Sequence, residues 1–302
     1  MVEHLPVLMR EVLGFLKPER GGVYIDATVG LGGHGIEILR AVAGRGLLIG
    51  MDRDEEALKV AETRFLSAGM KDFVLKKARF SEMEAVLNQL NIKGVDGILM
   101  DLGVSMYQLK APGRGFSFMA DEPLDMRMDR TAPLTAAEIV NTYPERELAR
   151  ILWEYGEERN SRKIAKAIVT RRPKNPVKTT GELRDIVTRF YRGRWKVHPA
   201  TRTFQALRIA VNNELWELNE ALIASTRVLN APKGALAPVP GRLVALSYHS
   251  LEDRIVKHFI REKEREGIFV NLTKKPVTAS DEEIRANPSA RSAKLRAAER
   301  VI

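Results

Sequence analysis

Short apolar runs alternate with helix-like stretches along the first hundred residues of the chain. The apolar runs are 23–25, 47–51, 73–75 and 98–100. Between two of these runs, residues 54–66 repeat apolar positions every three or four residues, as one buried face of a helix does. Strands that alternate with helices predict a parallel sheet covered on both faces. Ligands of such sheets bind at the carboxyl ends of the strands.

The alternation stops near residue 105. A Gly- and Pro-rich stretch, 111–133, is followed by helical patterns, with a helix cap indicated at Thr179 and Thr180. Apolar residues then recur every three or four positions from Phe204 to Leu222, which predicts one long helix. Residues 242–247 again have the composition of a buried strand, so the sheet is expected to resume after a helical interruption.

These patterns predict an α/β fold, a doubly wound and mostly parallel Rossmann-like sheet with an inserted all-α domain. Residues 1–107 and 213–302 would form the sheet domain. Residues 108–212 would form the helical insert.

The composition removes several classes of chemistry. The chain of 302 residues contains no cysteine, which excludes disulfides, thiolate metal sites and cysteine nucleophiles. No apolar run approaches the roughly 18 residues that a membrane span needs. The N-terminal stretch has acids within its apolar run and no basic start, unlike a signal peptide. A soluble, cytoplasmic protein is therefore expected.

The positive charge is concentrated in one segment. The net charge is +10, and residues 155–202 hold fourteen Lys and Arg against four acids, so this segment carries the whole excess. Tyr191, Trp195 and Phe204 lie in or beside it. Cations interleaved with aromatic rings favour a polyanion whose bases can stack, which means a nucleic acid. A solvated helical surface is the alternative.

A glycine turn follows the first strand. Gly30, Gly32 and Gly35 satisfy the dinucleotide pattern G-x-G-x-x-G, and Asp52 follows 22 residues after Gly30, where an acid could bind ribose hydroxyls. A nicotinamide-dependent oxidoreductase is one interpretation of this pattern. Surface charge is the alternative role for Asp52.

Asp26 stands four residues before Gly30 and favours a different ligand for the glycine turn. The resulting pattern, D-x-x-x-G-x-G, resembles motif I of S-adenosylmethionine-dependent methyltransferases. A carboxylate suits a cationic sulfonium group but would repel a pyrophosphate. A cap on the following helix is the alternative role for Asp26.

Two residues are candidates for the transfer chemistry. Asp101 ends the fourth strand, in GILMDLGVS, where it could accept a hydrogen bond from an exocyclic amine. Without cysteine, no covalent nucleophile is present for C5 of a pyrimidine, which leaves attack by nitrogen or oxygen. His249, in LSYHSLEDR, could take the released proton. Its neighbours Ser250 and Asp253 have capping-box spacing, and a metal cluster with Glu252 and Asp253 is less favoured.

Eight motifs are spread in order over nearly the whole chain. They are HLPVLMREVL (4–13), DATVGLGGHG (26–35), DRD (52–54), DGILMDLGVS (96–105), GRGFSF (113–118), PLDMRMD (123–129), SYHSLEDRIVKHF (247–259) and ARSAKLRAAER (290–300). Together they resemble the bacterial ribosomal RNA small-subunit methyltransferase H family, also called MraW. The resemblance implies methyl transfer from S-adenosylmethionine to N4 of a cytidine in the decoding region of 16S rRNA.

The resemblance also implies site residues and partners. Cofactor contacts are expected at Gly32, Gly33, His34, Asp52, Phe80, Asp101 and Gln108. The partner would be the small ribosomal subunit or its 16S rRNA, bound by the helical insert, with neither a membrane nor a metal ion involved. The oligomeric state is left open, a homodimer included. A non-catalytic ribosome-binding factor that keeps a relic cofactor fold is a further alternative.

The chain departs from the family at three positions. Met106 replaces a second serine, Lys110 replaces an acid, and Tyr248 replaces phenylalanine. A base contact by that serine therefore cannot be transferred to this chain. Arg114, Arg127 and the arginines of 290–300 are candidates for phosphate contacts, with salt bridges that anchor loops as the alternative.

Overall fold

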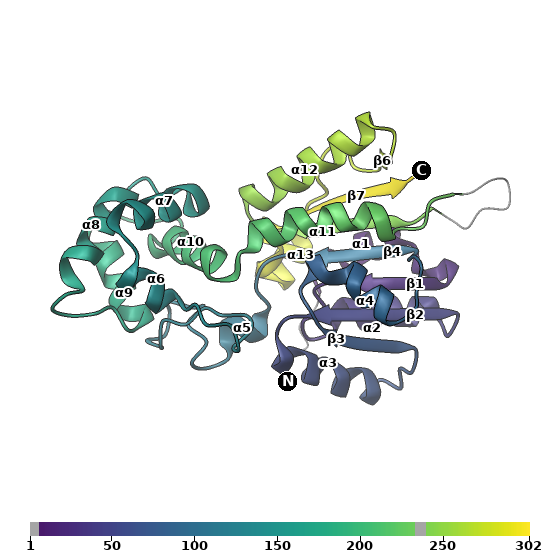
Figure 1. Cartoon of the computed structure of the whole chain (residues 1–302), viewed down its shortest axis with the longest axis horizontal. Coiled ribbons are helices and arrows are strands. Elements are labelled where there is room, and N and C mark those ends of the chain that lie inside the picture. Colours follow the sequence, from purple (N-terminus) through teal and green to yellow (C-terminus); the bar gives the residue numbers. More distant parts are fainter. Residues whose placement is uncertain (1–5, 233–239) are drawn as a thin grey trace. The chain divides into compact units, whose positions relative to one another are not determined.

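The computed structural model describes residues 6–232 and 240–302, which form two compact units (Figure 1). Unit 1 comprises Met1–Gly103 and Leu215–Ile302, and unit 2 comprises Val104–Glu214. The sequence patterns placed the corresponding boundaries at residues 107 and 213. The first two residues of the motif at 4–13 lie outside the described part of the chain.

Unit 1 is built on a sheet that has seven strands within the described residues, in the order β3-β2-β1-β4-β5-β7-β6. The strands are β1 (Gly22–Asp26), β2 (Gly46–Asp52), β3 (Phe73–Lys77), β4 (Gly97–Asp101), β5 (Arg242–Ser247), β6 (Phe269–Asn271) and β7 (Lys294–Arg300). The first five strands are parallel, and β7 pairs antiparallel with both β5 and β6. The order in which successive strands are added reverses between β1 and β4, so a ligand site is expected at their carboxyl ends.

Successive side chains of the central strands enter two different cores. Ile25, Ile49 and Ile98 belong to one core, together with side chains of α4 (Met83–Gln89), α11 (Glu214–Val228) and α12 (Ser250–Arg265). The alternate residues Tyr24 and Leu48 belong to the other, with α1 (Met9–Leu16), α2 (Gly33–Val42) and α3 (Glu55–Ser67). This period of two explains why the strands appear as unbroken apolar runs in the sequence.

Unit 2 is helical. Its helices are α5 (Met106–Lys110), α6 (Ala136–Thr142), α7 (Glu145–Gly156), α8 (Ser161–Arg171), α9 (Thr180–Thr188) and α10 (Ala200–Asn212). Leu148, Ile164, Leu183 and Leu207 are fully buried in a core of its own. The predicted fold class, a mostly parallel doubly wound sheet with an all-α insert, is confirmed. In the described part of the chain, every helix is too short or too polar to cross a membrane.

The long helix predicted from Phe204 to Leu222 is wrong, because two helices occupy this stretch. Helix α10 ends at Asn212, Asn213 has a left-handed backbone with φ 52°, and α11 begins at Glu214. Asparagine tolerates this conformation better than most residues. The Asn212 amide also accepts from the Met128 N–H and donates to the Met126 carbonyl, both at 2.8 Å. The spacing of apolar residues does not show where a single residue adopts a left-handed backbone, so it could not locate the break between α10 and α11.

Three of the arginines proposed to contact phosphates are held by contacts within the chain. Arg296 lies in β7, is 6% exposed, and donates from Nε to Oδ1 of Asp253 at 2.7 Å. In unit 2, Arg114 is 2% exposed and donates to the carbonyls of Arg127 and Met128. Arg127 makes a two-fold contact with Asp125, at 2.8 and 2.7 Å. Arg127 and Arg296 therefore make the anchoring salt bridges of the alternative, and Arg114 is anchored by carbonyl groups. Phosphate contacts by these residues stay a prediction.

Candidate active site

The glycine turn joins β1 to α2 in a shape that requires glycine. Gly32 is the residue before the helix and has φ 77°. A Cβ atom there would lie 2.4 Å from the Phe65 ring, and a Cβ on Gly33 would lie 2.8 Å from Pro6. Helix α2 begins at Gly33 and has no acid in its first turn. The first N–H groups of a helix lack partners within the helix, so they suit a carboxylate or another anion.

Asp52 ties this turn to the end of β2. Its Oδ2 accepts the N–H of Gly30 at 2.9 Å, and its Oδ1 accepts the N–H of Asp54 at 2.9 Å. Burial raises the pKa of Asp52 to about 6, against the lowering effect of these two hydrogen bonds. The residue chosen from the sequence spacing therefore lies directly against the glycine turn.

Asp26 ends β1 and is only 2% exposed. Burial, followed by the charge of Asp101, raises its pKa to about 8, although the N–H of Thr28 donates to it at 3.3 Å. At neutral pH this carboxyl group holds its proton. The negative charge that would suit a sulfonium therefore develops at Asp26 only when a nearby cation favours it.

Asp101 ends β4 and is held by three groups. Its N–H donates to Thr28 Oγ1 at 2.7 Å, and its Oδ1 accepts from the Tyr248 hydroxyl at 2.7 Å. His34 Nδ1 lies 3.5 Å from Oδ2. The other His34 nitrogen, Nε2, lies 3.0 Å from the Val7 carbonyl, which can only accept, so Nε2 carries a hydrogen. A bond between Nδ1 and Oδ2 therefore needs a second proton, on His34 or on Asp101.

Tyr248 is the member of this group that sequence reasoning missed as a contact. Burial, then the neighbouring Asp101 charge, raises the pKa of its hydroxyl well above the ordinary range, so the hydroxyl stays a donor. Asp101 is in register with Leu246 across β4 and β5, and Tyr248 follows two residues later on the same side. The pairing of β4 with β5 predicts the contact between Tyr248 and Asp101, but only when the register of the two strands is known.

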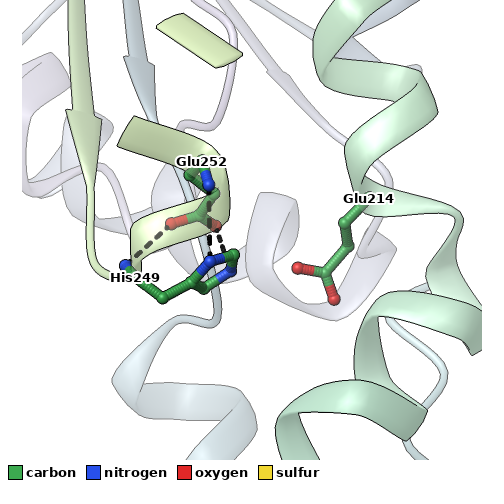
Figure 2. Close-up of side chains that lie close together, drawn as sticks. All are labelled: Glu214, His249 and Glu252. Atoms are coloured by element: carbon green, nitrogen blue, oxygen red, sulfur yellow. Dashed lines mark hydrogen bonds and ion pairs between the residues drawn. The ribbon is translucent and has the colours of Figure 1, made fainter. Parts of the chain in front are cut away.

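His249 caps its own helix. Figure 2 shows the imidazole folded against Glu252, with Nδ1 3.4 Å from the Glu252 N–H and Nε2 3.1 Å from Glu252 Oε1. Glu252 in turn accepts the N–H of His249 at 3.3 Å. The predicted capping box of Ser250 and Asp253 is therefore wrong by one position, because α12 starts at Ser250 with His249 as its cap. Asp253 binds Arg296 instead.

The remaining predicted residues lie in different parts of the chain. Phe80 opens a 3₁₀ turn after β3, is half-buried, and has the Arg53 guanidinium 5.7 Å from its ring centroid. Gln108 belongs to unit 2, where it is 4% exposed. Its Oε1 accepts the Ser105 N–H at 3.1 Å and closes the cap of α5.

The raised pKa of Asp26 predicts how stability depends on pH. The folded protein binds this proton up to about pH 8, whereas the unfolded chain releases it near the ordinary value of 3.8. The stabilisation that protonated Asp26 gives the folded protein is complete below pH 3.8 and is lost as pH rises toward 8. Over this range the free energy of unfolding falls by about 1.4 kcal/mol per pH unit. Asp52 contributes with the same sign up to about pH 6.

Asp26→Asn should remove most of this pH dependence. The measurement is urea unfolding of both proteins between pH 5 and pH 8, with Asp72→Asn, an exposed acid of unit 1, as the matched control. Parallel pH profiles for Asp26→Asn and the unmodified chain would contradict the assignment.

The fold and this cluster define a class of protein. A doubly wound sheet carries a glycine turn and acids at the ends of β1, β2 and β4, on either side of the point where strand order reverses, as in α/β proteins that bind a nucleoside-containing ligand. A family model described as the MraW methylase family matches residues 1–301, so the chain belongs to that family. Membership decides between the interpretations of the glycine turn: a methylase, not an oxidoreductase.

Curated relatives resemble the chain over its full length. A Ribosomal RNA small subunit methyltransferase H from Persephonella marina is 49% identical and covers 100% of both chains. Its namesake from Kosmotoga olearia is 48% identical over 99% of this chain and 97% of its own. A solved rRNA methylase from Streptococcus thermophilus has a TM-score of 0.45 at 10% identity, covering 97% of this chain and 94% of that one, too low a likeness to add an argument.

Proposed function

We propose that the chain is an S-adenosylmethionine-dependent methyltransferase of the small ribosomal subunit, and that it methylates N4 of a cytidine in the decoding region of 16S rRNA. Family membership and the names of full-length relatives support the reaction class and the RNA. The N4 position and the decoding region follow from the motif resemblance. Acting on ribosomal RNA, the enzyme would work in the cytoplasm.

The observation that carries the proposal is the position of the Asp101 carboxylate. It ends β4 beside the point of strand reversal and is linked to the glycine turn through Thr28 and His34. Its side chain is 26% exposed, so it is open to a ligand while its neighbours hold its orientation. A carboxylate oriented in this way suits an exocyclic amine, which presents N–H donors.

The residues present fit S-adenosylmethionine, which supplies an electrophilic methyl group when bound. The open start of α2 at Gly33 suits the carboxylate of its amino-acid part. Asp52 would accept from the ribose hydroxyls, and Phe80 would contact the adenine ring. The buried Asp26 offers a site where a cation becomes favourable, because the cation stabilises the ionised carboxyl. His34 and Gln108 remain proposed cofactor contacts from the motif resemblance.

The chemical work of this chain would be positioning and removal of a proton. Each carboxylate oxygen can accept more than one hydrogen bond, so Tyr248 and His34 leave room for an amine N–H on Asp101. Holding that hydrogen turns the nitrogen lone pair toward the methyl group, as a direct displacement requires. His249 is the proposed acceptor of the released proton, and it must give up its contact with the Glu252 N–H to act.

Nucleoside analysis of small-subunit RNA tests the proposal. RNA from cells with and without this protein is digested, and mass spectrometry measures methylated cytidines and their position. We expect N4-methylcytidine at one position in the decoding region, present only when the protein is present. Transfer to purified 16S rRNA and to assembled subunits is compared in the same way.

Two results would count against the proposal in different ways. A methyl group on another atom of the RNA would reject the N4 target but keep the reaction class. Cofactor binding without transfer to either RNA or subunits would favour the non-catalytic ribosome-binding factor.

A further inference from the structure

A short loop of unit 2 combines an exposed indole with cations that have no acidic partner. Residues 192–197 join α9 to α10 and are all exposed. They alternate Arg192, Arg194 and Lys196 with Gly193, Trp195 and Val197. Trp195 is 45% exposed. Among the described residues, none of the three cations makes an ion pair.

The absence of acids extends well beyond the loop. No Asp or Glu occurs from residue 186 to residue 213, a stretch that also contains Arg189 and Arg202. Elsewhere in unit 2, acids neutralise arginines, as Asp125 does Arg127, Glu182 does Arg171 and Glu214 does Arg208. Cations without an acidic partner, as Arg192, Arg194 and Lys196 are, attract a polyanion.

The loop is anchored at both ends. At the start, the Tyr191 hydroxyl donates to the fully buried Glu158. The partial burial of Tyr191, followed by this hydrogen bond, raises the pKa of Tyr191 to about 12. At the end, the His198 ring stacks on Phe118 with ring centroids 4.6 Å apart. His198 also contacts Trp195 edge to face, at 5.8 Å. The loop is therefore preorganised, which lowers the entropy cost of binding.

Resting on the proposed function, we infer that loop 192–197 is a docking surface for a single-stranded segment of the RNA substrate. Trp195 stacks on a base, and Arg192, Arg194 and Lys196 contact the adjoining phosphates. The alternation favours RNA over a protein partner, because an aromatic plane between cations matches the repeat of bases and phosphates along an unpaired strand. An apolar protein surface would call for a continuous apolar patch instead.

Trp195→Ala tests the inference, and the chain supplies a matched control. Trp153 on α7 is more exposed, at 59%, but the nearby Arg150 is already paired with Glu147 and Glu154. Binding of a labelled single-stranded oligoribonucleotide is measured over a range of salt concentrations. We expect Trp195→Ala to weaken binding about 5- to 150-fold. Trp195→Phe should restore most of the affinity, and Trp153→Ala should leave it within about twofold of the unmodified protein.

The cations are tested by salt dependence. Replacing Arg194 or Lys196 with Ala should lower the slope of log affinity against log salt by about 0.7 for each cation. Equal affinities for Trp195→Ala and Trp153→Ala would overturn the inference. So would a loss confined to assembled subunits with no loss on the oligoribonucleotide, because the partner would then be another part of the subunit and not an unpaired RNA strand.

The outcome is separable from that of the proposed function. Normal methyl transfer combined with unchanged RNA affinity in Trp195→Ala rejects the docking surface alone. Loss of RNA affinity in a protein that transfers no methyl group to ribosomal RNA rejects the proposed reaction and keeps the surface. Cofactor affinity, measured in parallel, is expected to be the same in all these variants.

Discussion

Replacing Asp101 with asparagine is expected to lower the rate of methyl transfer by about 100-fold or more. The amide has nearly the same shape, and its oxygen can still accept from Tyr248 at the position of Oδ1. It lacks the negative charge that holds an amine hydrogen and stabilises the nitrogen as it becomes cationic. The measurement is single-turnover transfer to small-subunit RNA at saturating cofactor, with cofactor affinity determined separately.

Asp72→Asn is the control for this experiment, because it removes an exposed acid of the same unit. A target-holding role requires the rate to fall by more than the cofactor affinity does. Equal losses in both quantities would make Asp101 a cofactor contact only. Undiminished transfer would remove Asp101 from the chemistry altogether.

The same assay separates the two roles of His249. Asparagine is a favourable residue before a helix, so His249→Asn should keep the cap of α12 and the thermal stability of the protein. The asparagine side chain cannot accept a proton near neutral pH. A loss of transfer at unchanged stability therefore reports proton transfer, and full activity leaves His249 as a cap.

Replacing Asp52 with alanine is expected to weaken cofactor binding by about 30-fold or more. Two effects add, because the variant loses the proposed acceptor for ribose hydroxyls and also leaves the N–H groups of Gly30 and Asp54 without their partner. Each effect is worth about 1–3 kcal/mol. Calorimetric titration with S-adenosylmethionine measures the sum.

A second ligand separates the two effects. The unmodified protein should bind a 2′-deoxy analogue of the cofactor more weakly than the cofactor itself, whereas Asp52→Ala should bind both with similar affinity. An analogue penalty that persists in Asp52→Ala would mean that Asp52 supports the glycine turn but does not bind the ribose.

The sequence was sufficient for those parts of the site that depend on strand order. Asp26, Asp52 and Asp101 each end a strand, and the apolar runs located all three strands within a few residues. Parallel strands bring their carboxyl ends to one edge, so the acids could be assigned to a common region before the structure was known.

Other features depend on information that periodicity does not carry. The contact between Tyr248 and Asp101 joins residues 147 positions apart and requires the register of β4 and β5. Strand β7 was missed because two of its positions are arginines, and Arg296 is buried only through its pairing with Asp253. The protonation of Asp26 follows from burial, which a residue pattern cannot measure.

The way the helical unit interrupts the sheet has a consequence for folding. Strands β4 and β5 are hydrogen-bonded neighbours, yet Asp101 and its partner Leu246 are 145 residues apart in the chain. Closing so long a segment carries a large entropic cost and slows the pairing of distant strands. Because residues 104–214 contain a core of their own, they can collapse first, and the remaining gap becomes much shorter. During synthesis, the edge of β4 that pairs with β5 therefore stays unpaired until the insert has been made, and it is open to mispairing in that interval.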